Sequence, residues 1–243
     1  MPRFFDELVF EPNIDELREM QRDRKVTVFT GYNNSGKSAY LKKIAESEKV
    51  LYLGPNRFYS FHFMNLFNYD ENELNNYRNN MNSQRRSQYS NFETSFYDTN
   101  RALTRLSDNK RKQLFDVFED LFGVAACVKP EFPDNEFSNK YVDIGGDSLS
   151  VTSSGTRLFL GVLAALMDDR FQTVALDEPE LGLSPMLQSK LAPIIIERLR
   201  DETLFPHAPH FFITTHAHTF LDKQVPSNNF VVSRDGNTIT ARP

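Results

Sequence analysis

The sequence holds little cysteine and no long apolar run, and each shortage excludes a class of protein. Its one cysteine, Cys127, cannot form a disulfide within the chain and leaves no cysteine cluster for a metal. The longest apolar run, residues 158–167, is too short to span a bilayer. Residues 1–20 are rich in acidic side chains, unlike a secretory signal peptide. We therefore expect a cytoplasmic protein that does not act with a membrane.

Strong positive charge is also missing from the chain as a whole. The 243 residues carry a formal net charge of −5, which excludes a general binder of polyanions. A hydrophobic content of 40% suits one sizeable α/β domain, and we expect residues 1–243 to form it.

The central motif lies at residues 31–38, where GYNNSGKS fits G-x-x-x-x-G-K-[ST] without a mismatch. Residues 26–30 before it predict a buried strand, and residues 39–45 after it predict a helix. Strand, turn and helix N-terminus together aim backbone N–H groups at phosphate. Lys37 should reach the β and γ phosphates, and Ser38 should bind Mg²⁺. The predicted nucleotide contacts are Gly31, Asn33, Asn34, Ser35, Gly36, Lys37, Ser38 and Ala39.

A second motif follows a short apolar strand predicted at residues 173–176. The chain continues with Asp177, Glu178, Pro179 and Glu180, which is the Walker B pattern of a hydrophobic strand followed by Asp-Glu. Asp177 would hold Mg²⁺ through water. Glu178 would orient and polarise the attacking water as the catalytic base. Ser184 is then expected to cap the next helix.

A histidine ends the last predicted core strand, residues 210–216. A lone histidine is more often structural than catalytic, but His216 falls at the edge of the sheet where ligands of open α/β sheets bind. There it could donate to the γ-phosphate or orient the water. His218 is the second candidate.

A Ser/Gly turn at residues 152–156 opens the helix predicted at 157–167. Ser153, Ser154 and Gly155 can form a second anion site by the same dipole argument. One nucleotide needs only one such site, so this turn suggests that a second copy of the chain supplies the other half. Taken alone, it is equally an ordinary serine cap.

The remaining segments predict local structure more than chemistry. A strand at 50–53 ends in a turn carrying Asn56 and Arg57, and Arg57 is a candidate phosphate contact. Residues 60–125 are interpreted as a helical or irregular insertion in the same domain, with a helix from Asp108 to Gly123. Residues 141–151 and 229–241 predict hairpins, the second turning at Asp235 and Gly236.

Basic side chains outnumber acidic ones between residues 77 and 112, and aromatic residues lie among them. Such a segment could hold a nucleic-acid backbone and stack on its bases. A solvated insertion or a protein-docking face is the preferred interpretation, since charge runs are usually solvated.

The order GYNNSGKS, TSSGT, VALDEPE and ITTH resembles the ABC-type ATPase superfamily. Within it, the chain is similar to the soluble SMC-like and MutS-like branch, above all to the ATPase domains of overcoming-lysogenisation-defect (OLD) nucleases and related bacterial AAA-labelled proteins. The similarity covers about residues 24–54 and 141–241. It implies a P-loop NTPase of ABC-ATPase type, with a mostly parallel core sheet flanked by helices and an antiparallel β portion.

The resemblance also implies an Mg²⁺-dependent ATPase that forms a head-to-tail homodimer, or a higher even oligomer, around two ATP molecules. Residues 181–184 would then be the dimer-contact loop. A separate effector protein in antiviral defence or DNA repair is the implied partner. Two departures stand out: Ser154 replaces a usual glycine of the signature, and no Q-loop glutamine follows the strand at 50–53. The rivals are a transporter nucleotide-binding subunit, an ATP-gated scaffold that barely hydrolyses, and, more distantly, a nucleotide kinase.

Overall fold

The computed structural model of the protein describes residues 7–22, 24–46, 50–54, 103, 106–135, 138–168, 171–197 and 210–243. Asn56 and Arg57 lie outside the described residues, as do the predictions made for residues 60–102.

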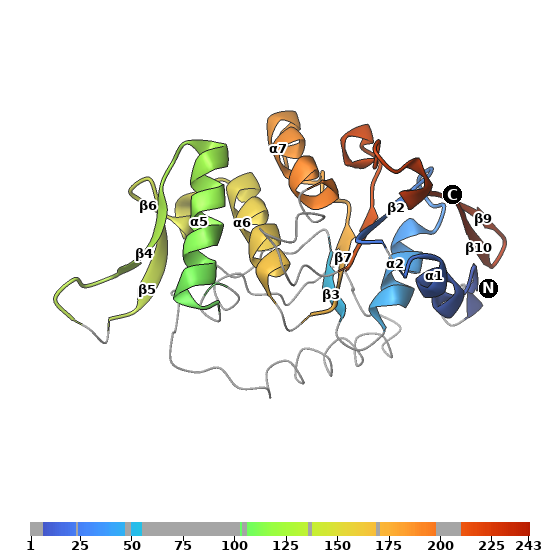
Figure 1. The fold of residues 1–243 in the computed structure, drawn as a ribbon, viewed down its shortest axis with the longest axis horizontal. Helices are drawn as coiled ribbons and strands as arrows, with labels where there is room; N and C mark the ends of the chain where they lie inside the picture. Colours follow the sequence, from blue (N-terminus) through green and yellow to red (C-terminus); the bar gives the residue numbers. More distant parts are fainter. Residues whose placement is uncertain are drawn as a thin grey trace.

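A seven-stranded sheet forms the centre of the fold, in the order β1-β10-β9-β2-β8-β7-β3 (Figure 1). Every neighbouring pair is parallel except the hairpin of β9 and β10. The mostly parallel sheet expected from the sequence is therefore confirmed. Its strands are β1 Val9–Glu11, β2 Val26–Thr30, β3 Val50–Leu53, β7 Thr173–Asp177, β8 His210–Thr214, β9 Asn229–Asp235 and β10 Thr238–Arg242.

Helices cover both faces of this sheet, because its strands are apolar on both sides. Side chains alternate along a strand, so Val28 packs on one face and Phe29 on the other. The core around Phe29 includes side chains of α1 Ile14–Met20 and α2 Lys37–Ala45. The core around Val28 includes side chains of α5 Asp108–Phe122, α6 Ser154–Met167 and α7 Pro185–Ile196. The sheet is thus packed between helices on its two faces.

The helix ends follow the capping chemistry of the sequence, with small shifts. Ser107, not Asp108, caps α5, because its side chain accepts from the Lys110 amide; Gly123 ends the helix with φ 68°. Helix α2 begins at Lys37, two residues earlier than predicted, and α6 begins at Ser154, three residues earlier than predicted. In both cases the first turn lies inside the phosphate-binding pattern, which has no apolar periodicity to mark it.

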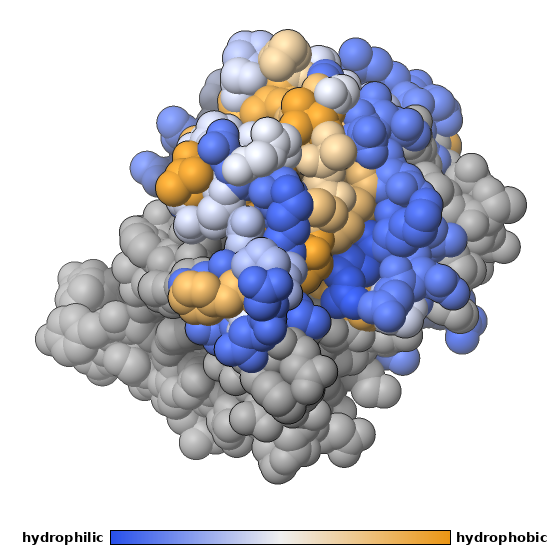
Figure 2. All heavy atoms as spheres, turned by 90° about the vertical axis from the view of Figure 1, so that its left-hand side faces the viewer, coloured by the Kyte–Doolittle hydropathy of each residue, from blue (hydrophilic) through white to orange (hydrophobic). Residues whose placement is uncertain are grey.

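A separate three-stranded antiparallel sheet, β4-β5-β6, lies at the end of the molecule opposite the two termini (Figure 1). It consists of β4 Ala126–Pro130, β5 Lys140–Ile144 and β6 Asp147–Ser148. The predicted hairpin turns at Gly145 and Gly146, but its second strand stops at Ser148 and a 3-10 helix, Leu149–Val151, follows. Apolar atoms form a band bordered by hydrophilic ones on this end of the molecule (Figure 2).

The C-terminal hairpin is confirmed with its turn moved by one residue. Asp235 pairs with Thr238, so Gly236 and Asn237 form the turn. Two 3-10 helices, His218–Phe220 and Pro226–Asn228, connect β8 to this hairpin. Among the described helices, none is long and apolar enough to cross a membrane.

Candidate nucleotide and magnesium site

The loop between β2 and α2 is shaped by backbone conformations that favour glycine. Gly31 has φ 147° and Gly36 has φ 96°. A Cβ at Gly31 would lie 2.4 Å from the Val232 carbonyl oxygen, and one at Gly36 would lie 2.6 Å from the Ile239 side chain. The hairpin β9–β10 therefore presses against this loop and leaves no room for side chains at its two ends.

Helix α2 turns its N-terminus toward the same loop. The Tyr40 amide makes its first bond, to the Gly36 carbonyl at 2.8 Å, so the amides before it face the loop. The Ser35 hydroxyl is buried there and has no hydrogen-bond partner among the described residues. A buried polar atom of this kind calls for a partner, and phosphate at a helix N-terminus supplies acceptor oxygens.

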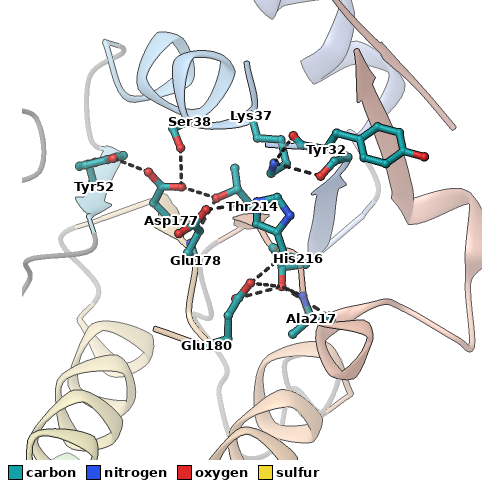
Figure 3. Close-up of polar contacts among 12 residues, drawn as sticks. Tyr32, Lys37, Ser38, Tyr52, Asp177, Glu178, Glu180, Thr214, His216 and Ala217 are labelled. Carbon is teal, nitrogen blue, oxygen red and sulfur yellow. Dashed lines mark hydrogen bonds and ion pairs between the residues drawn. The ribbon is translucent and has the colours of Figure 1, made fainter. Parts of the chain in front are cut away.

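Lys37 folds back over the loop (Figure 3). Its Nζ donates to the carbonyls of Gly31 at 3.1 Å and Tyr32 at 3.0 Å. Burial lowers the pKa of Lys37, while the charges of Glu178 and Asp177 act against that shift. The ammonium is thus held beside the predicted phosphate position. It is also close enough to Glu178 and Asp177 for their charges to stabilise it.

Asp177 is the centre of a cluster of hydroxyl donors from three other elements (Figure 3). Ser38 of α2 donates to its Oδ1 at 3.0 Å, and Thr214 of β8 donates to the same oxygen. Tyr52 of β3 donates to Oδ2 at 2.8 Å. Serine hydroxyl and carboxylate oxygens are the hard ligands that Mg²⁺ prefers, so Ser38 and Asp177 fit the ion together.

Glu178 follows in a strained conformation. Its φ is 48°, which a residue with a side chain rarely adopts, and its amide donates to the Thr214 carbonyl at 3.0 Å. Burial raises the pKa of Glu178, and the charges of Asp177 and Glu180 act in the same direction. Nε2 of His216 lies 3.4 Å from Glu178 Oε1. A carboxylate with a raised pKa beside an imidazole can accept a proton from water.

Glu180 holds the segment that carries the histidine. Its two carboxylate oxygens accept from the Thr215 hydroxyl, each at 2.9 Å, and its Oε1 accepts from the His216 amide at 2.6 Å. The Thr215 hydroxyl also accepts from the Ala217 amide at 2.9 Å.

The second predicted anion turn lies on α6, away from these contacts. Ser153 caps the helix, and its side chain accepts from the Thr156 amide at 3.1 Å. A Cβ at Gly155 would lie 3.3 Å from the Gly182 carbonyl and 2.7 Å from Leu187. The turn therefore packs against the predicted contact loop, 181–184. In the described part of the chain, no hydrogen bond or ion pair joins residues 153–155 to residues 31–38.

The structure brings most of the predicted site residues to one sheet edge and adds three that the sequence interpretation missed. Lys37, Ser38, Asp177, Glu178 and His216 lie together, as the sequence predicted, whereas Ser153, Ser154 and Gly155 do not join them in one chain. The added residues are Tyr52, Thr214 and Glu180. Of these three, only Thr214 and Glu180 could have been suspected from the sequence, because each lies within two residues of a predicted site residue.

The sequence over residues 39–222 matches the family described as "AAA domain, putative AbiEii toxin, Type IV TA system". This span covers more than half of the chain and includes Asp177, Glu178 and His216. The chain belongs to this AAA family. Gly31 to Ser38 lie just before the matched residues, so the family and the P-loop are supported by separate observations. A search of curated proteins gave no match to this AAA domain.

Solved structures of ATPase heads and cassettes show a low similarity to the AAA domain. The SMC head domain from Thermotoga maritima has 15% identity and a TM-score of 0.47, covering 90% of each chain. The ADP form of an ATP-binding cassette of an ABC transporter has 14% identity and a TM-score of 0.43, covering 88% of this chain and 78% of that chain. An Smc head with an extended coiled coil, derived from Pyrococcus furiosus, has 14% identity and a TM-score of 0.40 over 70% of this chain.

The AAA domain spans 41%, 40% and 31% of the length of three such Smc head structures, less than half of each. The assignment of the chain to this AAA family rests on the sequence match over residues 39–222, not on these similarities.

Proposed function

We propose that the protein binds ATP with Mg²⁺ and hydrolyses it at the edge where β2, β7 and β8 end. The contact between Ser38 Oγ and Asp177 Oδ1 carries this proposal, because it joins the P-loop helix to the carboxylate strand at 3.0 Å. A metal ion held by both side chains, by Asp177 through water, would lie against the phosphates of a nucleotide in the P-loop.

Each residue of the site has a separate role in this proposed reaction. The Lys37 ammonium and the leading amides of α2 bind the β and γ phosphates, together with the loop from Gly31 to Ala39. Ser38 and Asp177 hold the ion, which supplies charge neutralisation to the phosphates when bound. Glu178 accepts a proton from the attacking water, and His216 orients that water or donates to the γ-phosphate.

We further propose that the active form is a head-to-tail homodimer, or a larger even assembly, with the Ser153 turn of each copy facing the nucleotide of the other. The separation of residues 153–155 from the P-loop within one chain supports this arrangement. So does the contact of Gly155 with the loop at 181–184, which places both predicted interface segments side by side. A two-fold axis would complete both sites at once.

The biological setting that we propose follows from the resemblance of the motifs to the OLD-like branch. The dimer would act in the cytoplasm as an ATP-driven switch for a separate effector protein, in antiviral defence or DNA repair. Nucleic acid is a possible partner of residues 77–112, most of which lie outside the described residues.

The replacement Lys37→Ala tests the nucleotide site. Loss of the buried cation should abolish ATP binding, because Lys37 is the one basic residue in the P-loop sequence, residues 31–38. Fluorescent ATP titration and release of inorganic phosphate measure the two steps. Lys42→Ala, on a later turn of the same helix, should bind and hydrolyse ATP as the unchanged protein does.

Three outcomes separate the alternatives. Normal ATP affinity in Lys37→Ala would contradict the P-loop assignment. Tight binding by the unchanged protein without multiple-turnover phosphate release would identify an ATP-gated scaffold. Copurification with a membrane protein would favour a transporter subunit.

A further inference from the structure

Glu180 has no role in the reaction proposed above, yet its carboxylate accepts from two hydrogen-bond donors beside it, the Thr215 hydroxyl and the His216 amide. Both of its carboxylate oxygens accept from the Thr215 hydroxyl, and Oε1 also accepts from the His216 amide at 2.6 Å. These are charge-assisted bonds, which are about twice as strong as those between neutral groups.

The two ends of this contact are anchored differently. The Glu180 backbone is fixed in the turn before α7, because its carbonyl accepts from the Leu183 amide at 3.1 Å and from the Gln188 side chain at 3.5 Å. Thr215 is buried and its amide still bonds to the Phe29 carbonyl of β2 at 3.0 Å. His216 has left the sheet, and its amide is held by the Glu180 carboxylate.

Glu178 lies beside the ring of His216, and Glu180 lies beside its backbone (Figure 3). The turn that allows this begins at the positive φ of Glu178 and closes with the Leu181 amide on the Glu178 carbonyl at 3.0 Å. Glu178 meets the imidazole ring at 3.4 Å, whereas Glu180 meets the backbone of the same residue.

We propose that Glu180 is a positioning residue, which fixes the backbone of Thr215 and His216 and thereby sets the His216 ring against Glu178. This inference rests on the proposed ATP hydrolysis. Without Glu180, the His216 amide loses its acceptor and the ring can leave the position from which it serves the water or the γ-phosphate. In this proposal Glu180 itself contacts neither nucleotide nor metal.

The contact itself can be tested without activity. Amide hydrogen exchange of His216, measured by mass spectrometry on short peptides, should speed up about tenfold or more in Glu180→Gln, because the amide loses a charged acceptor. Glu197→Gln removes the same charge from an exposed residue at the end of α7 and should leave this exchange unchanged. Equal His216 exchange in Glu180→Gln and in the unchanged protein would overturn the proposal.

The route through His216 can be tested by a double-mutant cycle. Glu180→Gln alone should lower kcat about tenfold with KM changed less than about twofold, and in a His216→Ala background it should lower kcat less than about twofold further. Thr215→Val should act in the same direction as Glu180→Gln, and Thr215→Ser, which keeps the hydroxyl, should not. Multiplied effects in the double variant would overturn the proposed route.

The two proposals fail in different ways. If the unchanged protein shows no Mg²⁺-dependent hydrolysis, the proposed function falls, and the exchange of the His216 amide still decides whether Glu180 holds this segment.

Discussion

Glu178 is held in a state that costs stability. Its backbone is strained at φ 48°, and burial and the neighbouring carboxylates raise its pKa, so that its charge is unfavourable in the folded protein. Glu178→Gln keeps the shape and removes the charge. We expect turnover to fall roughly 100-fold or more, with ATP binding retained, because the amide cannot accept a proton. Phosphate release and ATP titration check both points.

The same replacement should raise the melting temperature at neutral pH. A carboxyl whose folded pKa lies above its unfolded pKa favours folding at low pH, and this contribution is lost as the pH rises through the folded pKa. The advantage of glutamine should therefore disappear in acid, where both side chains are neutral.

Turnover of the unchanged protein should also fall as the pH drops through the raised pKa of Glu178. Turnover of Glu178→Gln within a few-fold of the unchanged protein would move the base elsewhere, with His216 next.

Tyr52 contacts the site through Asp177. Its hydroxyl donates to Oδ2, on the far side of the carboxylate from Ser38, and so fixes how Oδ1 faces the metal position. Tyr52→Phe should raise the Mg²⁺ concentration for half-maximal hydrolysis about tenfold, a typical effect of losing a group that orients a ligand. Magnesium titrations at saturating ATP measure this shift.

Tyr40→Phe is the matched control. It removes another buried tyrosine hydroxyl, which donates to the Pro12 carbonyl on the opposite side of α2. The two variants should lose similar stability, but Tyr40→Phe should keep the magnesium requirement of the unchanged protein. An equal shift in both would show that Tyr52 acts only through general stability.

At the scale of single residues, the sequence predicted those whose spacing is fixed by local chain geometry. Lys37 and Ser38 follow Gly31 within one turn of loop and helix, so the motif determines their positions. Tyr52 reaches Asp177 only because β3 pairs with β7, a neighbour relation between strands far apart in the chain. Nothing in the residues around Tyr52 encodes that pairing, and its role could not be predicted from the sequence.

Ser153 caps helix α6 and also has a role in the proposed dimer. The Ser153 oxygen caps the helix by accepting from the Thr156 amide, and its O–H would donate to the nucleotide of a second copy. Ser153→Ala should therefore lower the free energy of unfolding by about 1 kcal/mol, the usual value of a serine cap. It should also lower kcat, which a cap alone would not do. Chemical denaturation and phosphate release measure the two effects.

Ser107 provides the comparison for this prediction. It is an exposed serine cap on α5, whose side chain accepts from the Lys110 amide at 3.4 Å. Ser107→Ala should cost similar stability and leave kcat unchanged. If Ser153→Ala also leaves kcat unchanged, the turn on α6 is only a cap.

Among the elements, apolar periodicity was a good guide to the buried strands and helices. The strand β4, Ala126–Pro130, was missed because its exposed positions alternate with half-buried ones and its last residue is proline. The sequence also extended the hairpin to Val151, although that side chain is 73% exposed and lies in a 3-10 helix. A short edge strand gains little burial, so its pattern is weak.

For the whole molecule, the proposed association with a second copy would use the exposed apolar surface beside the site. Leu181 is 45% exposed, Met186 is 63% exposed, and Val151 is 73% exposed, and these side chains flank the loop and the turn that we place in the interface. An interface that forms only with ATP needs such a surface to be open in the single chain, with the γ-phosphate adding a charged contact to Ser153. Hydrolysis would remove that contact and release the two copies.

Light scattering can test this cycle with two variants. Glu178→Gln should have the mass of a dimer or a larger even multiple with ATP and Mg²⁺, because it binds ATP without consuming it, and a smaller mass with ADP. Adding Ser153→Arg places a bulky side chain in the interface. It should restore the smaller mass with ATP, while ATP binding to each copy stays within a few-fold. A mass that never changes across both variants and both nucleotides would mean that the assembly is permanent or absent. If that constant mass is the mass of one chain, the γ-phosphate acts within a single chain, and the Ser153 turn has no nucleotide to contact.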